Sequence, residues 1–267
     1  MLPQDYHLHT HFSGDSRAEM EAVCRAAIAR GIREIAFVDH HDFETFSDEF
    51  NRLRLCDYRA EIERCRGLYG DRLTIRCGVE VGEPHAFPAQ ARELLGGLDF
   101  DVVMASLHYI GETATWNGQF FSRYPLEEGV RAYFAELARM VAEADFDILG
   151  HFDVVLYAAH HTFGLGTLDY TPYEDEVRAI LRTLAARGRA LEINTKSLRR
   201  GMRASNPPLQ VLRWFREEGG ERVTVGSDAH EPDSVGAGLE LALILAREAG
   251  FTQLACYEGR QVRPVPL

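Results

Sequence analysis

The chain has 267 residues, of which 46% are hydrophobic and 26% are charged. This length allows a sizeable core, in one large α/β domain or in two small ones. The formal net charge of −12 disfavours unspecific nucleic-acid binding, because most of the surface would repel a polyanion, but it leaves room for a local basic pocket that takes a small anion. No apolar run approaches the roughly 18 residues that cross a bilayer, so we expect no membrane segment.

The cysteines and the N-terminus point to the cytoplasm. The five cysteines are odd in number, and no two of them form a C-x-x-C pair. They are typical of reduced thiols in a cytosolic protein and not of a disulfide framework or a thiolate zinc site. The first residues lack the basic start and apolar stretch of a signal peptide. The composition therefore predicts a cytoplasmic globular protein, and it leaves the oligomeric state open.

Short apolar runs alternate with longer amphipathic ones along the whole chain. The apolar runs predict seven strands, at residues 5–9, 34–38, 73–81, 100–106, 146–149, 190–194 and 223–226. The amphipathic runs predict helices at residues 17–30, 58–68, 87–95, 126–144, 173–187, 207–218 and 235–249, and a weak strand is expected near Leu254. Residues 112–124 and 158–171 are predicted as long loops.

Strands that alternate with helices favour parallel βα units. Seven units follow one another without a linker-like stretch rich in Pro, Gly or Ser, and no internal repeat is evident. We therefore expect a single domain over residues 1–267, folded as a closed or nearly closed α/β barrel.

Polar residues that can bind metals stand at the carboxyl end of each predicted strand. They are His7 and His9, Asp39 and His40, Glu80, His108, His151, Asn194, and Asp228 with His230. Barrel active sites are built from these strand ends. Nitrogen and oxygen ligands without thiolates suit Zn²⁺, Mn²⁺ or Fe²⁺. The ligands are too many for one ion, so the pattern predicts two or three divalent metals, with Glu80 bridging a pair.

Seven motifs carry a family resemblance over almost the whole chain. They are D-x-H-x-H at residues 5–9, V-D-H at 38–40, G-V-E at 78–80, S-L-H at 106–108, G-H-F-D at 150–153, E-I-N-T at 192–195 and G-S-D-A-H at 226–230. In this order they resemble the PHP (polymerase and histidinol phosphatase) superfamily, and within it the histidinol-phosphate phosphatase family. The resemblance implies a distorted (β/α)7 TIM-like barrel with a trinuclear metal centre.

The resemblance also implies a distribution of ligands. One metal would take His7, His9, Glu80 and Asp228; a second would share Glu80 and add His108 and His151; a third would take His40, His230 and Asp15. Some relatives have a histidine where this chain has Asp15. The aspartates Asp5, Asp39 and Asp153 are expected behind the ligands, where they would orient the histidines.

The implied reaction is attack of a metal-bridging hydroxide on a phosphate ester, with Glu80, Asp228 and His230 in the chemistry. Arg199, Lys196 and Asn194 are the candidate substrate-binding residues, because the family carries a similar N-T-x-x-L-R run. Relatives often have a second basic contact soon after G-H-x-D, whereas residues 154–157 here read V-V-L-Y. The expected substrate is L-histidinol phosphate. The alternatives are a nucleotide or another small phosphate ester, or a regulatory metal-binding module without turnover.

Overall fold

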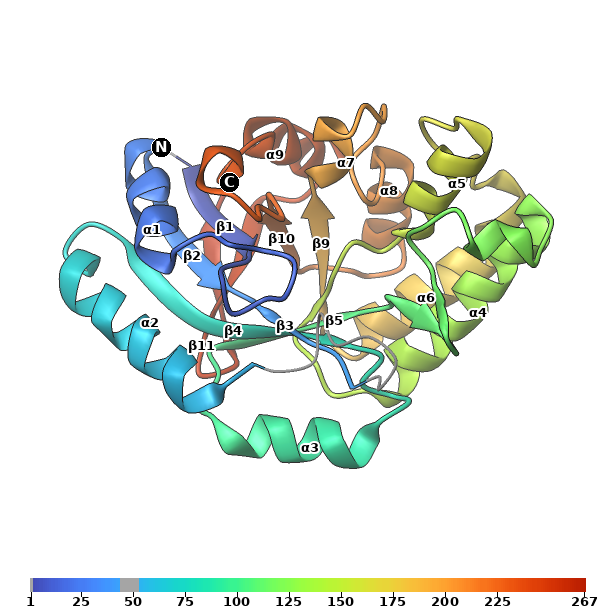
Figure 1. Ribbon diagram of the computed structural model, residues 1–267. Helices are drawn as coiled ribbons and strands as arrows, with labels where there is room; N and C mark the ends of the chain where they lie inside the picture. The colour runs from blue at the N-terminus through green and yellow to red at the C-terminus, as the bar shows by residue number, and fades with distance from the viewer. Residues whose placement is uncertain (1, 44–52) are drawn as a thin grey trace.

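The computed structural model describes residues 2–43 and 53–267. Within them, seven parallel strands surround a central core and helices cover the outside (Figure 1). The strands pair in chain order as β1 (Leu2–Leu8), β2 (Ile32–Phe37), β4 (Thr74–Gly82), β5 (Val102–Ser106), β8 (Ile148–Leu149), β9 (Ala190–Asn194) and β10 (Val223–Gly226). The short strand β3 (His40–His41) extends the pairing at the carboxyl end of β4.

The two edge strands of this sheet meet and nearly close the barrel. β10 packs against β1, and a parallel bridge joins Leu8 to Ala229 just beyond the two strand ends. The backbone N–H of His9 donates to the carbonyl of Ala229 at 2.9 Å. The predicted seven-stranded barrel is therefore confirmed, with only small shifts of the strand ends.

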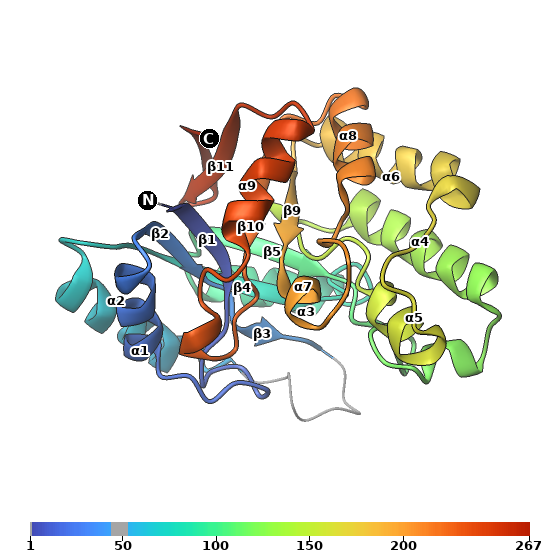
Figure 2. The same ribbon diagram turned by 90° about the horizontal axis from the view of Figure 1, so that it is seen from above.

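Helices lie around the outside of the strands (Figure 2). They are α1 (Met20–Ala29), α2 (Leu55–Tyr69), α3 (Pro88–Gly97), α4 (Leu126–Glu143), α5 (Val155–Phe163), α6 (Glu174–Ala186), α7 (Lys196–Arg199), α8 (Leu209–Glu217) and α9 (Leu239–Glu248). In α6, the buried residues Val177, Ile180, Leu181 and Leu184 recur at helical spacing and form one apolar face. Within the described residues, no helix is both long and apolar enough to cross a membrane.

The strands are buried on both faces, which explains their continuous apolar sequences. In β5, Val102 and Met104 belong to an inner cluster with Tyr6 of β1, whereas Val103 and Ala105 belong to the outer core beneath the helices. This alternation follows the two-residue period of a strand. Apolar residues thus fill the barrel interior, and the polar site is left at one end.

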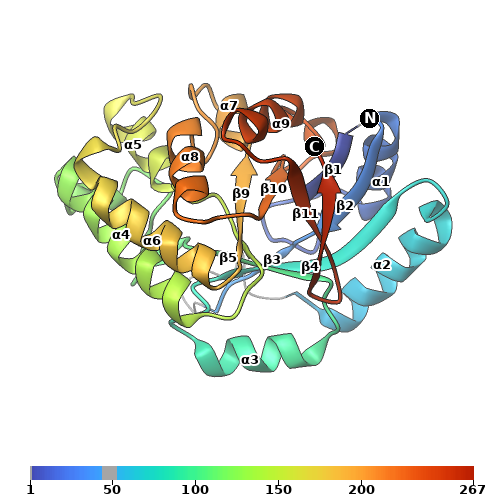
Figure 3. The same cartoon turned by 180° about the vertical axis from the view of Figure 1, so that it is seen from behind.

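A C-terminal hairpin packs at the opposite, amino end of the barrel (Figure 3). It consists of β11 (Gln253–Glu258) and β12 (Gln261–Pro266). Arg260 donates its backbone N–H to the carbonyl of Asp101, which precedes β5, and its side chain pairs with Asp147, which precedes β8. The sequence predicted a strand near Leu254 but not its partner β12, which is polar and largely exposed.

The prediction of a loop at residues 158–171 is wrong for its first residues. The helix α5 continues to Phe163 and ends at Gly164, which adopts the left-handed conformation with φ 68° that favours glycine after a helix. Residues 155–159 are all buried, so the segment shows no polar face that would reveal helical periodicity. His160 and His161 lie in the last turn of this helix and not in a loop turn.

The segment predicted as a loop at residues 112–124 contains short regular elements. A small hairpin pairs β6 (Tyr109–Ile110) with β7 (Thr113–Ala114), and a 3₁₀ turn, η1, covers Phe120–Ser122. Two further 3₁₀ turns, η2 (Thr171–Tyr173) and η3 (Pro232–Ser234), precede α6 and α9.

The contact between the hairpin and the barrel can be tested at Tyr6. Its buried hydroxyl donates to Glu34 and accepts the backbone N–H of Tyr257 at 2.9 Å. Tyr6→Phe leaves that N–H without a partner, so we expect the free energy of unfolding to fall by about 1–3 kcal/mol, measured by urea denaturation. The exposed Tyr124→Phe is the matched control. Equal stability of the two variants would contradict this role for the hydroxyl.

Candidate metal centre

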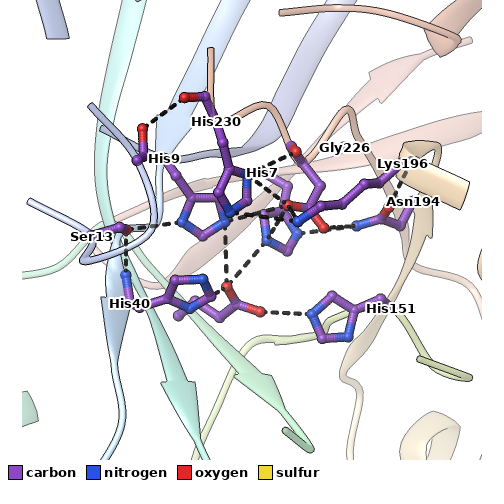
Figure 4. A network of polar contacts seen from close by, with 12 residues as sticks. His7, His9, Ser13, His40, His151, Asn194, Lys196, Gly226 and His230 are labelled. Atoms are coloured by element: carbon purple, nitrogen blue, oxygen red, sulfur yellow. Dashed lines mark hydrogen bonds and ion pairs between the residues drawn. The ribbon is translucent and has the colours of Figure 1, made fainter. Parts of the chain in front are cut away.

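The expected ligand residues converge at the carboxyl ends of the strands (Figure 4). His7 lies in β1, and His9 follows it by two residues and points to the same side. His40 comes from β3 and Glu80 from β4. Loops after β5, β8 and β10 bring the remaining ligand candidates, which are His108, His151, Asp228 and His230.

Glu80 occupies the centre of this cluster and is fully buried. Ser106 donates its hydroxyl to one oxygen, Oε1, at 2.5 Å. The two carboxylate oxygens face five imidazoles: Oε1 lies 2.9 Å from His151 Nε2 and 3.4 Å from His108 Nε2, and Oε2 lies 3.0 Å from His40 Nδ1, 3.2 Å from His7 Nε2 and 3.4 Å from His9 Nε2.

Several of these distances fit ligands of a shared ion better than direct hydrogen bonds. Ligand atoms about 2.1 Å from a tetrahedral ion lie about 3.4 Å from one another. His9 Nε2 is 3.4 Å from Glu80 Oε2 and 3.6 Å from Asp228 Oδ1, and it has no hydrogen-bond partner among the described residues although it is buried. A buried nitrogen without a partner is costly, and a metal ion would satisfy it. The donor set therefore fits metal binding.

Asp15 joins the cluster on the solvent side. One carboxylate oxygen, Oδ2, lies 2.8 Å from His230 Nε2 and 3.7 Å from His40 Nε2. The loop after β1 thus places an oxygen donor opposite two imidazoles, at the edge of the site.

Three side chains hold the second ring nitrogen of a ligand histidine. Glu192 accepts from His7 Nδ1 at 2.7 Å, and Asp42 accepts from His108 Nδ1 at 3.0 Å. Ser13 Oγ lies 3.1 Å from His9 Nδ1. Such contacts fix the ring orientation and leave Nε2 with a lone pair for a metal. The Glu192 carboxylate also accepts the backbone N–H of His151 at 2.7 Å, so it positions two ligands.

The supporting roles of Glu192, Asp42 and Ser13 were not predicted from the sequence. A signal for Glu192 did exist, because it stands two residues before Asn194 in β9 and so shares its face. Asp42 lies beyond the end of β3, where no strand period could place it.

The three aspartates expected behind the ligands make no direct side-chain hydrogen bond to a candidate ligand histidine among the described residues. Asp5 accepts the backbone N–H and hydroxyl of Ser227, at 2.8 and 2.6 Å. Asp39 accepts the hydroxyl of Ser13 at 2.8 Å, so it reaches His9 only through that serine. The third, Asp153, accepts hydrogen bonds from Tyr170 and Asn206 and contacts no imidazole among the described residues.

The loop after β10 is tightly constrained. A Cβ on Gly226 would lie 2.5 Å from His7 Cβ and would also collide with the Glu192 carboxylate, so only glycine fits there. Asp228 has φ 52°, which is strained for a residue other than glycine. Asn194 holds one of its oxygens at 3.1 Å, and Lys196 holds the other at 2.8 Å.

The electrostatics of the cluster keep its carboxylates ionised. Burial alone would raise the pKa of Glu80, but the charges of His7 and His40 outweigh it and hold that pKa well below the ordinary value. Burial is likewise outweighed at Asp228 by Lys196 and His7, so its pKa is also well below normal. Burial and the neighbouring imidazoles hold the pKa of His9 well below 6.5, so its ring is neutral. The ionised carboxylates and the neutral His9 ring are the states that bind cations. Although burial opposes the shift, the neighbouring carboxylates raise the pKa of His7 and of His40, so a bound metal would displace a proton from each ring.

A cavity of about 510 Å³ opens above the cluster. Its lining comprises Asp15, His40, Glu80, His108, Trp116, His151, Val154, Tyr157, Lys196, Arg199, Arg200, Asp228, His230, Glu231 and Ser234. The volume suits a small molecule, and cations, carboxylates and aromatic rings share the wall.

The three expected substrate-binding residues lie in different places. Arg199 lines the cavity, and its Nη2 donates to the carbonyls of Ser227 and Asp228 at 2.6 and 3.2 Å. Lys196, the only lysine in the chain, also lines it but pairs with Asp228. Asn194 is fully buried behind Asp228 and outside the cavity lining, so it supports the site from below.

Comparisons with known proteins agree with this geometry. Residues 5–196 match the model of the PHP domain family. The chain is 31% identical to a histidinol-phosphatase of Lactococcus lactis, with 98% of this chain and 97% of the relative covered. It is 29% identical to a probable histidinol-phosphatase of Deinococcus radiodurans, with 97% and 98% covered.

A solved structure shares the whole fold. It is the crystal structure of histidinol phosphate phosphatase from Lactococcus lactis, complexed with zinc, L-histidinol and phosphate. The TM-score is 0.86 at 29% identity, and the match covers 98% of each chain. A structure of a putative histidinol phosphatase from Listeria monocytogenes has the same fold, with a TM-score of 0.76 at 20% identity and coverage of 89% of this chain and 99% of the other.

The contacts of Glu192 generate a prediction about metal affinity. Glu192→Gln keeps the shape of the side chain but removes the charge that fixes His7, so we expect metal affinity to fall about 10- to 100-fold. Titration of the metal-stripped protein with Zn²⁺ in a calorimeter measures this change. Glu143→Gln, on the exposed face of α4, should leave the affinity unaltered. If both variants bind zinc like the unmodified protein, Glu192 does not position the ligands.

Proposed function

Because the chain belongs to the PHP domain family and to its histidinol-phosphatases, we propose that it hydrolyses L-histidinol phosphate to L-histidinol and phosphate with the help of bound metal ions. The observation that carries this proposal is the buried cluster of imidazoles and carboxylates directly beneath a cavity of about 510 Å³. The identity of the proposed substrate is inferred from the relatives, because they align with almost the whole chain.

Within this proposal, three ions divide the ligands. The first takes His7, His9, Glu80 and Asp228, the second takes Glu80, His108 and His151, and the third takes Asp15, His40 and His230. The contacts of Glu80 support a shared position between the first two, since one oxygen faces His7 and His9 and the other faces His108 and His151. Zinc is favoured by the Lactococcus structure, and the ligand types suit manganese or iron as well.

Bound divalent ions supply an activated water near neutral pH and neutralise the phosphoryl oxygens. The residues of the chain then have three tasks. Glu80 and Asp228 hold negative charge at the cavity floor, where it fixes the cations. His230, at the solvent side, holds its ring between the Asp228 carbonyl and Asp15. The apolar wall around Val154 and Trp116 limits water around the bound ester.

Arg199 is placed to bind the phosphate group. Two backbone carbonyls fix one of its nitrogens, Nη2, and the rest of the guanidinium can donate to a ligand. A guanidinium matches the paired oxygens of a phosphate. The cytoplasm suits this enzyme, because all five cysteines are free thiols. The net charge of −12 supports a small substrate and not a nucleic acid.

The number of ions is testable directly. We expect at least two ions for each chain after purification in excess metal, measured by mass spectrometry of the dialysed protein. His9→Ala should lower the count and abolish turnover, because it removes a ligand of the first ion. His11→Ala, which changes an exposed histidine outside the cluster, is its control. A single ion in the metal-replete protein would contradict the proposal that the cluster binds two or three ions.

The substrate is tested by comparing kcat/KM for histidinol phosphate, AMP and an aryl phosphate. We expect histidinol phosphate to exceed the aryl ester by at least about 100-fold, because two or three specific contacts contribute that much discrimination. Arg199→Ala should reduce kcat/KM about 100-fold by removing a charged hydrogen bond. Arg17→Ala changes an exposed residue outside the cavity lining and should have no effect. A preference for AMP would instead identify a nucleotide phosphatase.

A further inference from the structure

We propose that Tyr157 and Arg200 together form a second phosphate contact in the cavity, beside Arg199. This inference rests on the proposed phosphatase function and assigns two more residues to its substrate site. Tyr157 is the fourth residue after Asp153 and lies in α5. Arg200 directly follows α7, on a different βα loop. Both side chains line the cavity.

Tyr157 presents an unused donor at the cavity wall. The residue is 5% exposed, and its hydroxyl is buried without a hydrogen-bond partner among the described residues. Leaving a buried hydroxyl unpaired costs free energy, so its place in the lining points to a partner that arrives with the ligand. Burial also holds the pKa of Tyr157 well above 10, so the group keeps its proton and can donate it in a hydrogen bond.

Arg200 lies against the same ring. Its guanidinium carbon is 5.5 Å from the centroid of the Tyr157 ring, which is a cation–π distance. No hydrogen bond or ion pair to its side chain exists within residues 2–43 and 53–267. A guanidinium stacked on a ring keeps its edge free, and that edge carries the N–H groups that bind phosphate oxygens.

Besides the proposed metal ions, an anionic substrate needs side-chain donors to its remaining phosphate oxygens. Glu231 also lines the cavity, and its charge would repel a phosphate dianion. Lys196 is already paired with Asp228. Arg199 and Arg200 are the arginines in the cavity lining. Each guanidinium can donate to a phosphate oxygen, while the Tyr157 hydroxyl donates to a third oxygen.

Inorganic phosphate is the probe, bound to the metal-loaded protein and measured by calorimetry and as a product inhibitor. We expect Tyr157→Phe to weaken phosphate binding about 10-fold, and Arg200→Gln to weaken it about 10-fold or more, because each removes a donor to a charged oxygen. The matched controls are Tyr124→Phe and Arg203→Gln. Both lie outside the cavity lining, and Arg203 belongs to the same loop as Arg200.

Metal content and unfolding temperature are measured for each variant. Arg200 is exposed, so Arg200→Gln should fold even if Tyr157→Phe does not. Unchanged phosphate affinity in a folded, metal-loaded Arg200→Gln protein would overturn the proposal. Failure to prefer histidinol phosphate over an aryl ester would reject the substrate but would leave the phosphate result standing. The proposal is also contradicted if Tyr157→Phe and Arg200→Gln weaken phosphate binding no more than the control variants do.

Discussion

The carboxylate of Glu80 lies between imidazoles that come from four different strand ends. It is fully buried, and it stays ionised because the positive charges around it outweigh the cost of its burial. Its oxygens face His40 and His7 on one side and His151 on the other. Removing this carboxylate would take from His151 and His40 the oxygen that lies nearest to each ring. The mouth of the barrel is therefore organised around one anion.

The barrel gives that anion its position. Most strand residues are apolar and buried, and the candidate ligands lie near the carboxyl ends of the strands. Parallel strands deliver all their carboxyl ends to one side, so residues as distant as His9 and His230 meet without a local motif. The strain at Asp228 is tolerated because Asn194 and Lys196 hold its carboxylate on both oxygens.

The sequence predicted the elements whose signal is local. A strand such as residues 190–194 is apolar and ends at a polar residue, and its observed bounds are the predicted ones. Helix α5 was missed at its start because residues 155–159 are buried all round, which erases the polar face that marks a surface helix. Strand β12 was missed because its pairing with β11, and not its own composition, makes it a strand.

The same distinction applies to the site. The convergence of the candidate ligands could be predicted, because residues of metal-binding chemistry stand at the strand ends. The partners of the ligand rings could not, because Asp42 reaches His108 across 66 positions of sequence. The residues of the cavity wall are harder still to predict. Tyr157 lies in α5 and Arg200 follows α7, and no sequence pattern relates the two.

The closure between β1 and β10 has a consequence for the order of assembly. The strand β1 is made before its neighbour at Ala229, which lies in about the last seventh of these 267 residues. Until that neighbour is in place, β1 remains an open edge of the sheet. In the proposed arrangement, the first ion therefore lacks Asp228 as a ligand until the segment after β10 has closed the barrel.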